Sequence, residues 1–99
     1  MEIKRTQNGG AALLSLSGRL DTVTAPNLHE ELDQAYLVAS RVELDFTDVA
    51  YVSSAGLRVL LLGEKTAKAN GKVMVIKNIS DDVREIFEIT GFLAILTIE

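Results

Sequence analysis

The sequence contains no cysteine and only one histidine, His29. The missing cysteines exclude disulfide bonds and thiolate metal sites, and a single imidazole leaves no His and Cys cluster for zinc. We therefore expect no metal and no cofactor. A chain without cysteine is also compatible with a reducing cytosol.

Long apolar runs and basic runs are missing as well. No stretch resembles a membrane-spanning helix, and residues 1–6 are charged and lack the apolar segment of a signal peptide. We expect no membrane insertion and a cytoplasmic location. The formal net charge is -4 and 5% of the residues are aromatic. Nucleic-acid binding is not expected, because it depends on basic groups that neutralise phosphates and on aromatic rings that stack on bases.

What the chain has is an ordinary globular composition, with 47% hydrophobic and 24% charged residues in 99 positions. This length predicts one domain, residues 1–99. Alternating apolar residues predict strands, and a turn at Asn8-Gly9-Gly10 separates the first two. The expected strands are residues 1–7, 11–17, 41–46, 72–77 and 94–98.

Three helices are expected between these strands. The first opens at Thr24, a potential cap, and carries an apolar stripe made of Leu28, Leu32, Ala35 and Ala39. The second covers about residues 54–70, and the third runs from a Ser80 cap to Gly91. The alternation predicts an α/β fold with right-handed crossovers, in which a mostly parallel or mixed sheet of four or five strands packs with three or four helices.

The helix over residues 54–70 carries the most informative pattern. Its expected inner arc contains Ala55, Val59, Leu60, Leu62, Gly63 and Ala67. The opposite arc holds Ser54, Arg58, Glu64, Lys65 and Lys68, and with them the large apolar residues Leu57 and Leu61. An apolar pair rimmed by charge near a helix N-terminus is a candidate protein-docking patch. The alternative is that neighbouring loops bury both leucines.

Ser54 has two further interpretations at this stage. It can be a plain N-cap of the helix, which is the commonest role of a serine there. A nucleophilic role needs an adjacent base, and His29 is expected on an outer helix face. The Gly-x-Ser-x-Gly and Gly-x-x-x-x-Gly-Lys patterns are absent, so we do not expect an enzyme. Asp21, Asp45 and Asp48 are interpreted as turn formers.

Three blocks in the chain resemble the bacterial anti-sigma factor antagonists, whose fold is the STAS domain. The first is Gly18-Arg19-Leu20-Asp21-Thr22-Val23-Thr24-Ala25, similar to the family pattern Gly-x-Leu-Asp-x-x-Thr-Ala. The second runs from Asp48 to Leu57 and is similar to the family's phosphoserine segment. The third runs from Ile79 to Phe92 and is similar to the final helix with its glycine stop.

The resemblance implies a short β/α superhelix and a regulatory phosphorylation at Ser54. It also implies that Asp21 lies near the partner surface. Many relatives have aspartate where this chain has Ser53, and a serine where it has Ala55, so Ser53 is a competing phosphorylation site. Together with the helix pattern, this predicts a partner-binding set comprising Asp21, Thr22, Ser53, Ala55, Gly56, Leu57, Arg58 and Leu61.

In function, the resemblance implies a protein that binds an anti-sigma factor serine kinase and thereby frees a sigma factor. The kinase inactivates it by phosphorylation, and a phosphatase acting on phospho-Ser54 restores it. A competing interpretation is a STAS scaffold, or an accessory subunit of a stress-sensing complex or lipid transporter, that phosphorylation does not switch. An enzyme with Ser54 as nucleophile is the remaining alternative.

Overall fold

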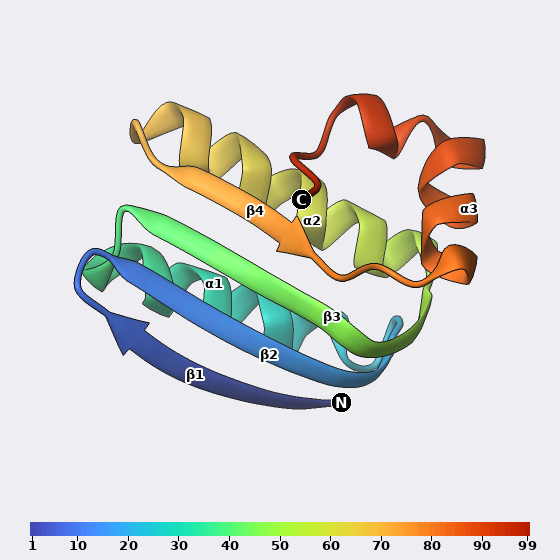
Figure 1. Cartoon of the computed structure of the whole chain (residues 1–99), viewed down its shortest axis with the longest axis horizontal. Coiled ribbons are helices and arrows are strands. Elements are labelled where there is room, and N and C mark those ends of the chain that lie inside the picture. Colours follow the sequence, from blue (N-terminus) through green and yellow to red (C-terminus); the bar gives the residue numbers. More distant parts are fainter.

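Strands and helices alternate along the chain, as Figure 1 shows, and the computed structural model describes all 99 residues. The elements are β1 (Glu2–Asn8), β2 (Ala11–Leu20), α1 (Ala25–Val38), β3 (Arg41–Val52), α2 (Ser54–Ala69), β4 (Val73–Lys77), α3 (Asp81–Thr90) and the short 3-10 helix η1 (Phe92–Ala94). No helix combines the length and the apolar character that a membrane crossing requires.

One mixed sheet organises the fold, with its strands in the order β1-β2-β3-β4. β1 and β2 form an antiparallel hairpin whose turn uses the positive φ of Gly9, while β2, β3 and β4 run parallel. The crossover helices α1 and α2 cover the same face of the sheet (Figure 1), as two right-handed crossovers in one direction require. The predicted α/β class and mixed, mostly parallel sheet are therefore confirmed.

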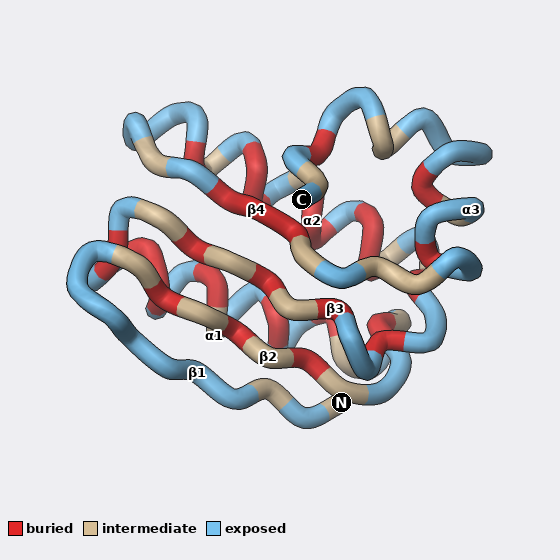
Figure 2. The backbone as a smooth tube through the Cα atoms, in the orientation of Figure 1, coloured by how far each residue is buried: buried red, intermediate tan, exposed pale blue.

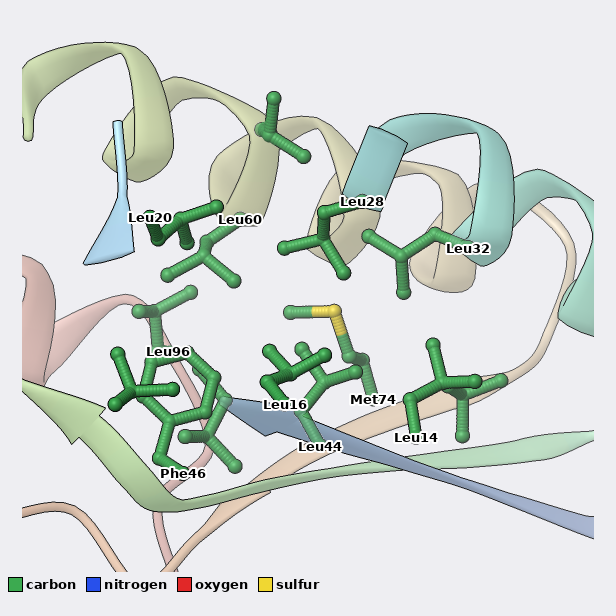
Figure 3. Close-up of a cluster of buried hydrophobic side chains, with 14 of the residues drawn as sticks. Leu14, Leu16, Leu20, Leu28, Leu32, Leu44, Phe46, Leu60, Met74 and Leu96 are labelled. Carbon is green, nitrogen blue, oxygen red and sulfur yellow. The ribbon is translucent and has the colours of Figure 1, made fainter. Parts of the chain in front are cut away.

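The core lies between this sheet and the two helices. Alternate side chains of the central strands point into it, and the predicted stripe of α1 is buried along its whole length, as the buried segments in Figure 2 show. Figure 3 shows how leucines from the strands and the helices interdigitate around Phe46 and Met74. The fully buried members of this cluster include Leu14, Leu20, Leu28, Val42, Leu44, Phe46, Leu60, Ile76 and Phe87.

Three strand predictions need correction. β2 continues to Leu20 rather than ending at residue 17. β3 continues to Val52 rather than ending at Phe46, because register shifts in its pairing with β2 absorb the break in alternation at Thr47 and Asp48. The expected strand over residues 94–98 is wrong. Gly91 ends α3 at φ +80, the chain then forms η1, and only Ile98 pairs with Ile76 of β4.

Candidate functional site

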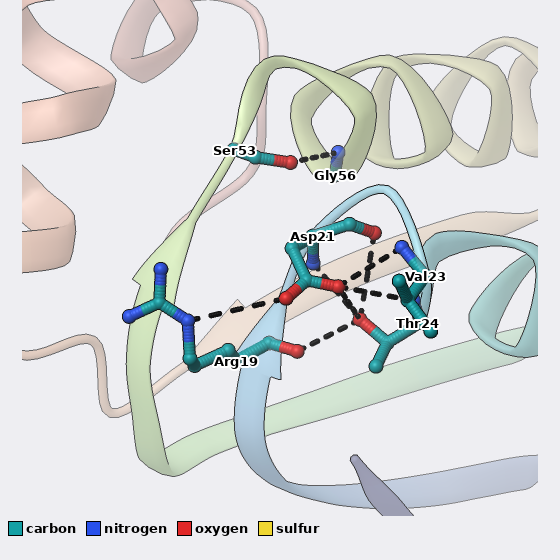
Figure 4. Close-up of polar contacts among 6 residues, drawn as sticks. All are labelled: Arg19, Asp21, Val23, Thr24, Ser53 and Gly56. Atoms are coloured by element: carbon teal, nitrogen blue, oxygen red, sulfur yellow. Dashed lines mark hydrogen bonds and ion pairs between the residues drawn. The ribbon is translucent and has the colours of Figure 1, made fainter.

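Two connections meet at the carboxyl ends of the central strands: the β2–α1 turn, residues 21–24, and the start of α2 (Figure 4). The Ser53 N–H donates to the carbonyl oxygen of Leu20 at 2.8 Å. A Cβ atom placed on Gly56 would lie 2.8 Å from that same oxygen. Only glycine permits this approach, so the first turn of α2 is seated directly on the end of β2.

The two adjacent serines occupy different environments. Ser53 is the N-cap of α2, and its half-buried hydroxyl accepts a hydrogen bond from the Gly56 N–H at 3.3 Å. Ser54 is the first helical residue and is exposed. The interpretation of Ser54 as the N-cap is therefore wrong, because the cap is the preceding residue, Ser53. Ser54 instead offers an accessible hydroxyl beside the free N–H groups at the start of the helix.

The β2–α1 turn is organised by Asp21. One of its carboxylate oxygens, Oδ1, accepts hydrogen bonds from the N–H groups of Val23 at 3.0 Å and Thr24 at 3.2 Å. The Thr24 Oγ1 accepts from the Asp21 N–H at 2.8 Å and donates to the carbonyl of Arg19 at 2.7 Å. Thr24 stands at the N-cap position of α1, as predicted, but its side chain ties the turn together instead of capping the helix.

These contacts set the charge state of Asp21. The N–H of Thr24 favours the carboxylate most strongly and holds the pKa of Asp21 below its ordinary value. Desolvation opposes this shift, and the N–H of Val23 adds to it. Its second oxygen, Oδ2, lies 3.9 Å from Nε of Arg19, whose guanidinium stacks 4.3 Å above the ring of Tyr51. The turn is thus also linked to the end of β3.

The docking patch expected at Leu57 and Leu61 does not exist as an exposed apolar pair. Leu57 is 7% exposed and belongs to the core, and Leu61 is half-buried. Glu64, expected to face water, is 6% exposed, whereas Leu62, expected inside, is 37% exposed. The reason is that α2 is covered by α1 as well as by the sheet, and the Tyr36 hydroxyl of α1 donates to the Gly63 carbonyl at 3.0 Å. The buried arc of α2 is therefore rotated relative to the predicted one, toward Leu57 and Glu64 and away from Leu62.

The remaining predicted site residues gather around the two connections. Thr22, Ser54 and Arg58 are exposed, and Asp21, Ser53 and Ala55 are half-buried. Gly56 is buried under the close approach described above. The residues predicted from the motifs therefore lie close together in the fold. Leu57 is the exception as a contact residue, because its side chain belongs to the core.

One residue of this region was not singled out from the sequence. Val23 is 85% exposed at the outer side of the β2–α1 turn. The available signal was its position between Asp21 and Thr24, two residues whose side chains bond to the turn backbone. This signal is weak in the sequence, because single exposed apolar side chains are common on protein surfaces.

Asp45 and His29 lie outside this region. Asp45 and Asp48, expected as turn formers at loop edges, both lie within β3 instead. Oδ1 of Asp45 accepts hydrogen bonds from the Thr47 hydroxyl at 2.6 Å and from the Thr47 N–H at 3.0 Å, next to the register shift in the pairing of β3 with β2. His29 is exposed on α1, as expected, where Nε2 lies 3.6 Å from Oδ2 of Asp33.

Comparison with known proteins gives these features a family context. The family profile described as Mlab, STAS domain matches residues 3–97. BtrV of Bordetella bronchiseptica, with a proposed anti-sigma factor antagonist role, is 35% identical over 99% of this chain and 85% of its own length. The anti-sigma-B factor antagonist of Listeria monocytogenes is 34% identical over 85% of this chain and 75% of its own.

Among solved structures, the anti-sigma factor antagonist SpoIIAA has the same fold. Its unphosphorylated form superimposes with a TM-score of 0.83 at 16% identity, covering 99% of this chain and 88% of SpoIIAA. The phosphorylated form of the Bacillus protein gives a TM-score of 0.76 at 15% identity, covering 99% of this chain and 91% of SpoIIAA. The profile match over almost the whole chain shows that the protein belongs to the STAS domain family, among relatives named for the antagonism of anti-sigma factors.

Proposed function

We propose that this STAS domain is an anti-sigma factor antagonist that binds an anti-sigma factor serine kinase in the cytoplasm and so frees a sigma factor. Phosphorylation of Ser54 by that kinase ends the binding, and a phosphatase restores it. The observation that carries the proposal is an exposed serine in the first turn of α2, next to the braced β2–α1 turn. In this role the chain acts by binding and not by catalysis.

Ser54 suits this role better than its neighbour. A kinase needs an accessible hydroxyl, and Ser54 is exposed. The Ser53 hydroxyl is half-buried and already accepts the capping hydrogen bond from Gly56. Phosphorylation of Ser53 would disturb the helix start, whereas phosphorylation of Ser54 leaves the cap in place.

The physical effect of the modification falls on docking rather than on folding. A phosphate adds about -1.5 to -2 charges at pH 7, and at the first position of a helix it meets free N–H groups and the positive end of the dipole. A partner that covers Ser54 must then desolvate this dianion. A thousandfold loss of affinity corresponds to about 4 kcal/mol, which is within the penalty of about 3–5 kcal/mol for an unpaired buried charge.

Peptide mapping tests the modification. Protein isolated from its own cells, analysed by intact mass with and without phosphatase treatment, is expected to carry one phosphate on the peptide that contains Ser54. With the purified kinase and ATP, Ser54→Ala is expected to abolish the modification and Ser53→Ala to retain it. Native protein free of phosphate at both serines under growth and stress would contradict the proposal.

Binding measurements test the consequence. Ser54→Asp is expected to weaken binding to the kinase with little change in thermal stability, since the side chain is exposed. Ser54→Ala is expected to bind like the wild type and to stay bound after ATP is added. A Ser54→Asp variant that binds as tightly as the wild type would refute the switch.

A STAS subunit without a phosphorylation switch is the competing proposal, because the fold itself does not require the modification. It predicts unmodified serines in native protein and co-purification with a scaffold complex or a membrane transport complex instead of a soluble kinase. The peptide mapping described above separates the two proposals.

A further inference from the structure

Three apolar side chains stand almost fully in solvent: Val23 at 85% exposure, Leu37 at 79% and Ile89 at 78%. Leu37 lies in the last turn of α1 and Ile89 near the end of α3. Only Val23 belongs to the β2–α1 turn, which directly follows Leu20, the residue on which the start of α2 is seated. We propose that Val23 is the apolar anchor of the kinase-binding surface and that it enters an apolar recess of the kinase; this inference rests on the function proposed above.

The first argument is that the turn holds Val23 in place before any partner arrives. The Val23 N–H donates to Asp21, and the flanking Asp21 and Thr24 bond to each other and, through Thr24, to Arg19 (Figure 4). A β-branched side chain on a fixed backbone has few rotamers to lose on docking. The entropy cost of using Val23 as a contact is therefore low, which is the condition for a preorganised anchor.

The second argument is the position of Val23 relative to the proposed switch. The turn follows Leu20 directly, and the carbonyl of Leu20 accepts a hydrogen bond from the Ser53 N–H and abuts Gly56, so the turn lies beside the first turn of α2 (Figure 4). A macromolecule that covers Ser54 therefore also meets the adjacent turn. The exposed neighbours Thr22 and Ser54 are polar. An apolar side chain surrounded by polar ones matches the general anatomy of an interface, in which an apolar centre has a polar rim.

The same position adds a reason why phosphorylation disrupts binding. A recess that accepts Val23 must be apolar, and a phosphate on Ser54 would place a dianion at its rim. The partner then loses either the apolar contact or the hydration of the phosphate. In this proposal the kinase contacts the apolar anchor Val23 and the switch residue Ser54 on the same part of the surface.

The test is a titration of the recombinant anti-sigma factor kinase of the same organism with five forms of the full chain. These are the wild type, Val23→Ser, Val23→Ile, and the matched controls Leu37→Ser and Ile89→Ser, which remove an equally exposed apolar side chain elsewhere. We expect about tenfold weaker binding for Val23→Ser, from the transfer energy of one apolar side chain. Val23→Ile should bind at least as well as the wild type, and both controls should stay within about twofold of it.

Thermal denaturation should be unchanged for all four variants, so that a loss of binding cannot be assigned to unfolding. A Val23→Ser variant that binds like Ile89→Ser would overturn the inference. Weakened binding of Ser54→Asp, measured against the same kinase as described under the proposed function, would then leave that function standing. Weakened self-association of Val23→Ser in sedimentation, with unchanged kinase binding, would also overturn it in favour of a second copy of this chain. A wild type that does not bind the kinase would overturn both.

Discussion

Replacing Gly56 by alanine tests the contact that seats α2 on β2. The added Cβ would lie 2.7 Å from Cγ and 2.8 Å from the carbonyl oxygen of Leu20, and 3.0 Å from Cγ1 of Val52. Leu20 is fully buried, and its carbonyl is fixed by the Ser53 N–H, so neither can move without the backbone. A helical alanine gains about 0.5–1 kcal/mol over glycine, while such overpacking costs about 1–3 kcal/mol. We expect a net loss of about 1–2 kcal/mol in the free energy of unfolding.

Gly63→Ala is the matched control, because replacing glycine by alanine gives the same gain in helix propensity in the same helix. Its Cβ would lie 2.9 Å from Sδ of Met74 and 3.0 Å from Cδ1 of Leu32, which are the ends of flexible side chains. Urea denaturation of both variants should therefore give a clearly smaller loss for Gly63→Ala. For a domain of this size each 1 kcal/mol corresponds to about 4–8 °C in Tm. Equal losses at the two positions, or a stabilised Gly56→Ala, would refute the reasoning.

Three further predictions follow from the same region. Ser53→Ala should lower the free energy of unfolding by about 1 kcal/mol through loss of the cap, and Ser54→Ala should change it by less than about 0.5 kcal/mol; equal values in urea denaturation would contradict the assignment. Leu57→Ala should lower it by about 2–4 kcal/mol, and a near-neutral result would place this side chain outside the core. The pKa values of Asp21 and Asp45 are below their ordinary value of 3.8 in the folded state. The contribution of these two carboxylates to the free energy of unfolding is therefore present above pH 3.8 and is lost as the pH falls through and below that value. Between pH 7 and pH 3, the free energy of unfolding of Asp21→Asn should fall less steeply than that of the wild type.

The sequence allowed most of the fold to be predicted because its apolar periodicities are long and clean. The stripe of α1 and the alternation of Val42, Leu44 and Phe46 each point to one buried face, and the structure confirms both. The end of β3 was missed because a bulge interrupts the alternation, and bulges have no periodic signature. The segment over residues 94–98 has strand-like residues, but the preceding η1 leaves it only one bridge to β4.

The candidate site was located from its motifs, while its chemistry required the structure. The helical wheel treats a helix as covered from one side, and α2 is covered from two, which placed Leu57 and Glu64 on the wrong face. The position of the cap was off by one residue, as helix ends commonly are. Asp21 was expected near a partner, but its Oδ1 is already committed to the turn backbone, and no pattern of residue types reveals such an internal bond.

The hydroxyl groups of Ser53 and Ser54 have different roles, and this difference affects how such a chain can evolve. The hydroxyl of Ser53 serves the architecture of the helix, while that of Ser54 has no architectural duty in the cap. Under the proposed switch, a lineage can therefore abandon or regain regulation by a substitution at Ser54 alone, without passing through an unstable ancestor. Regulated and permanently active versions of this domain would then be separated by one substitution on a scaffold that tolerates either.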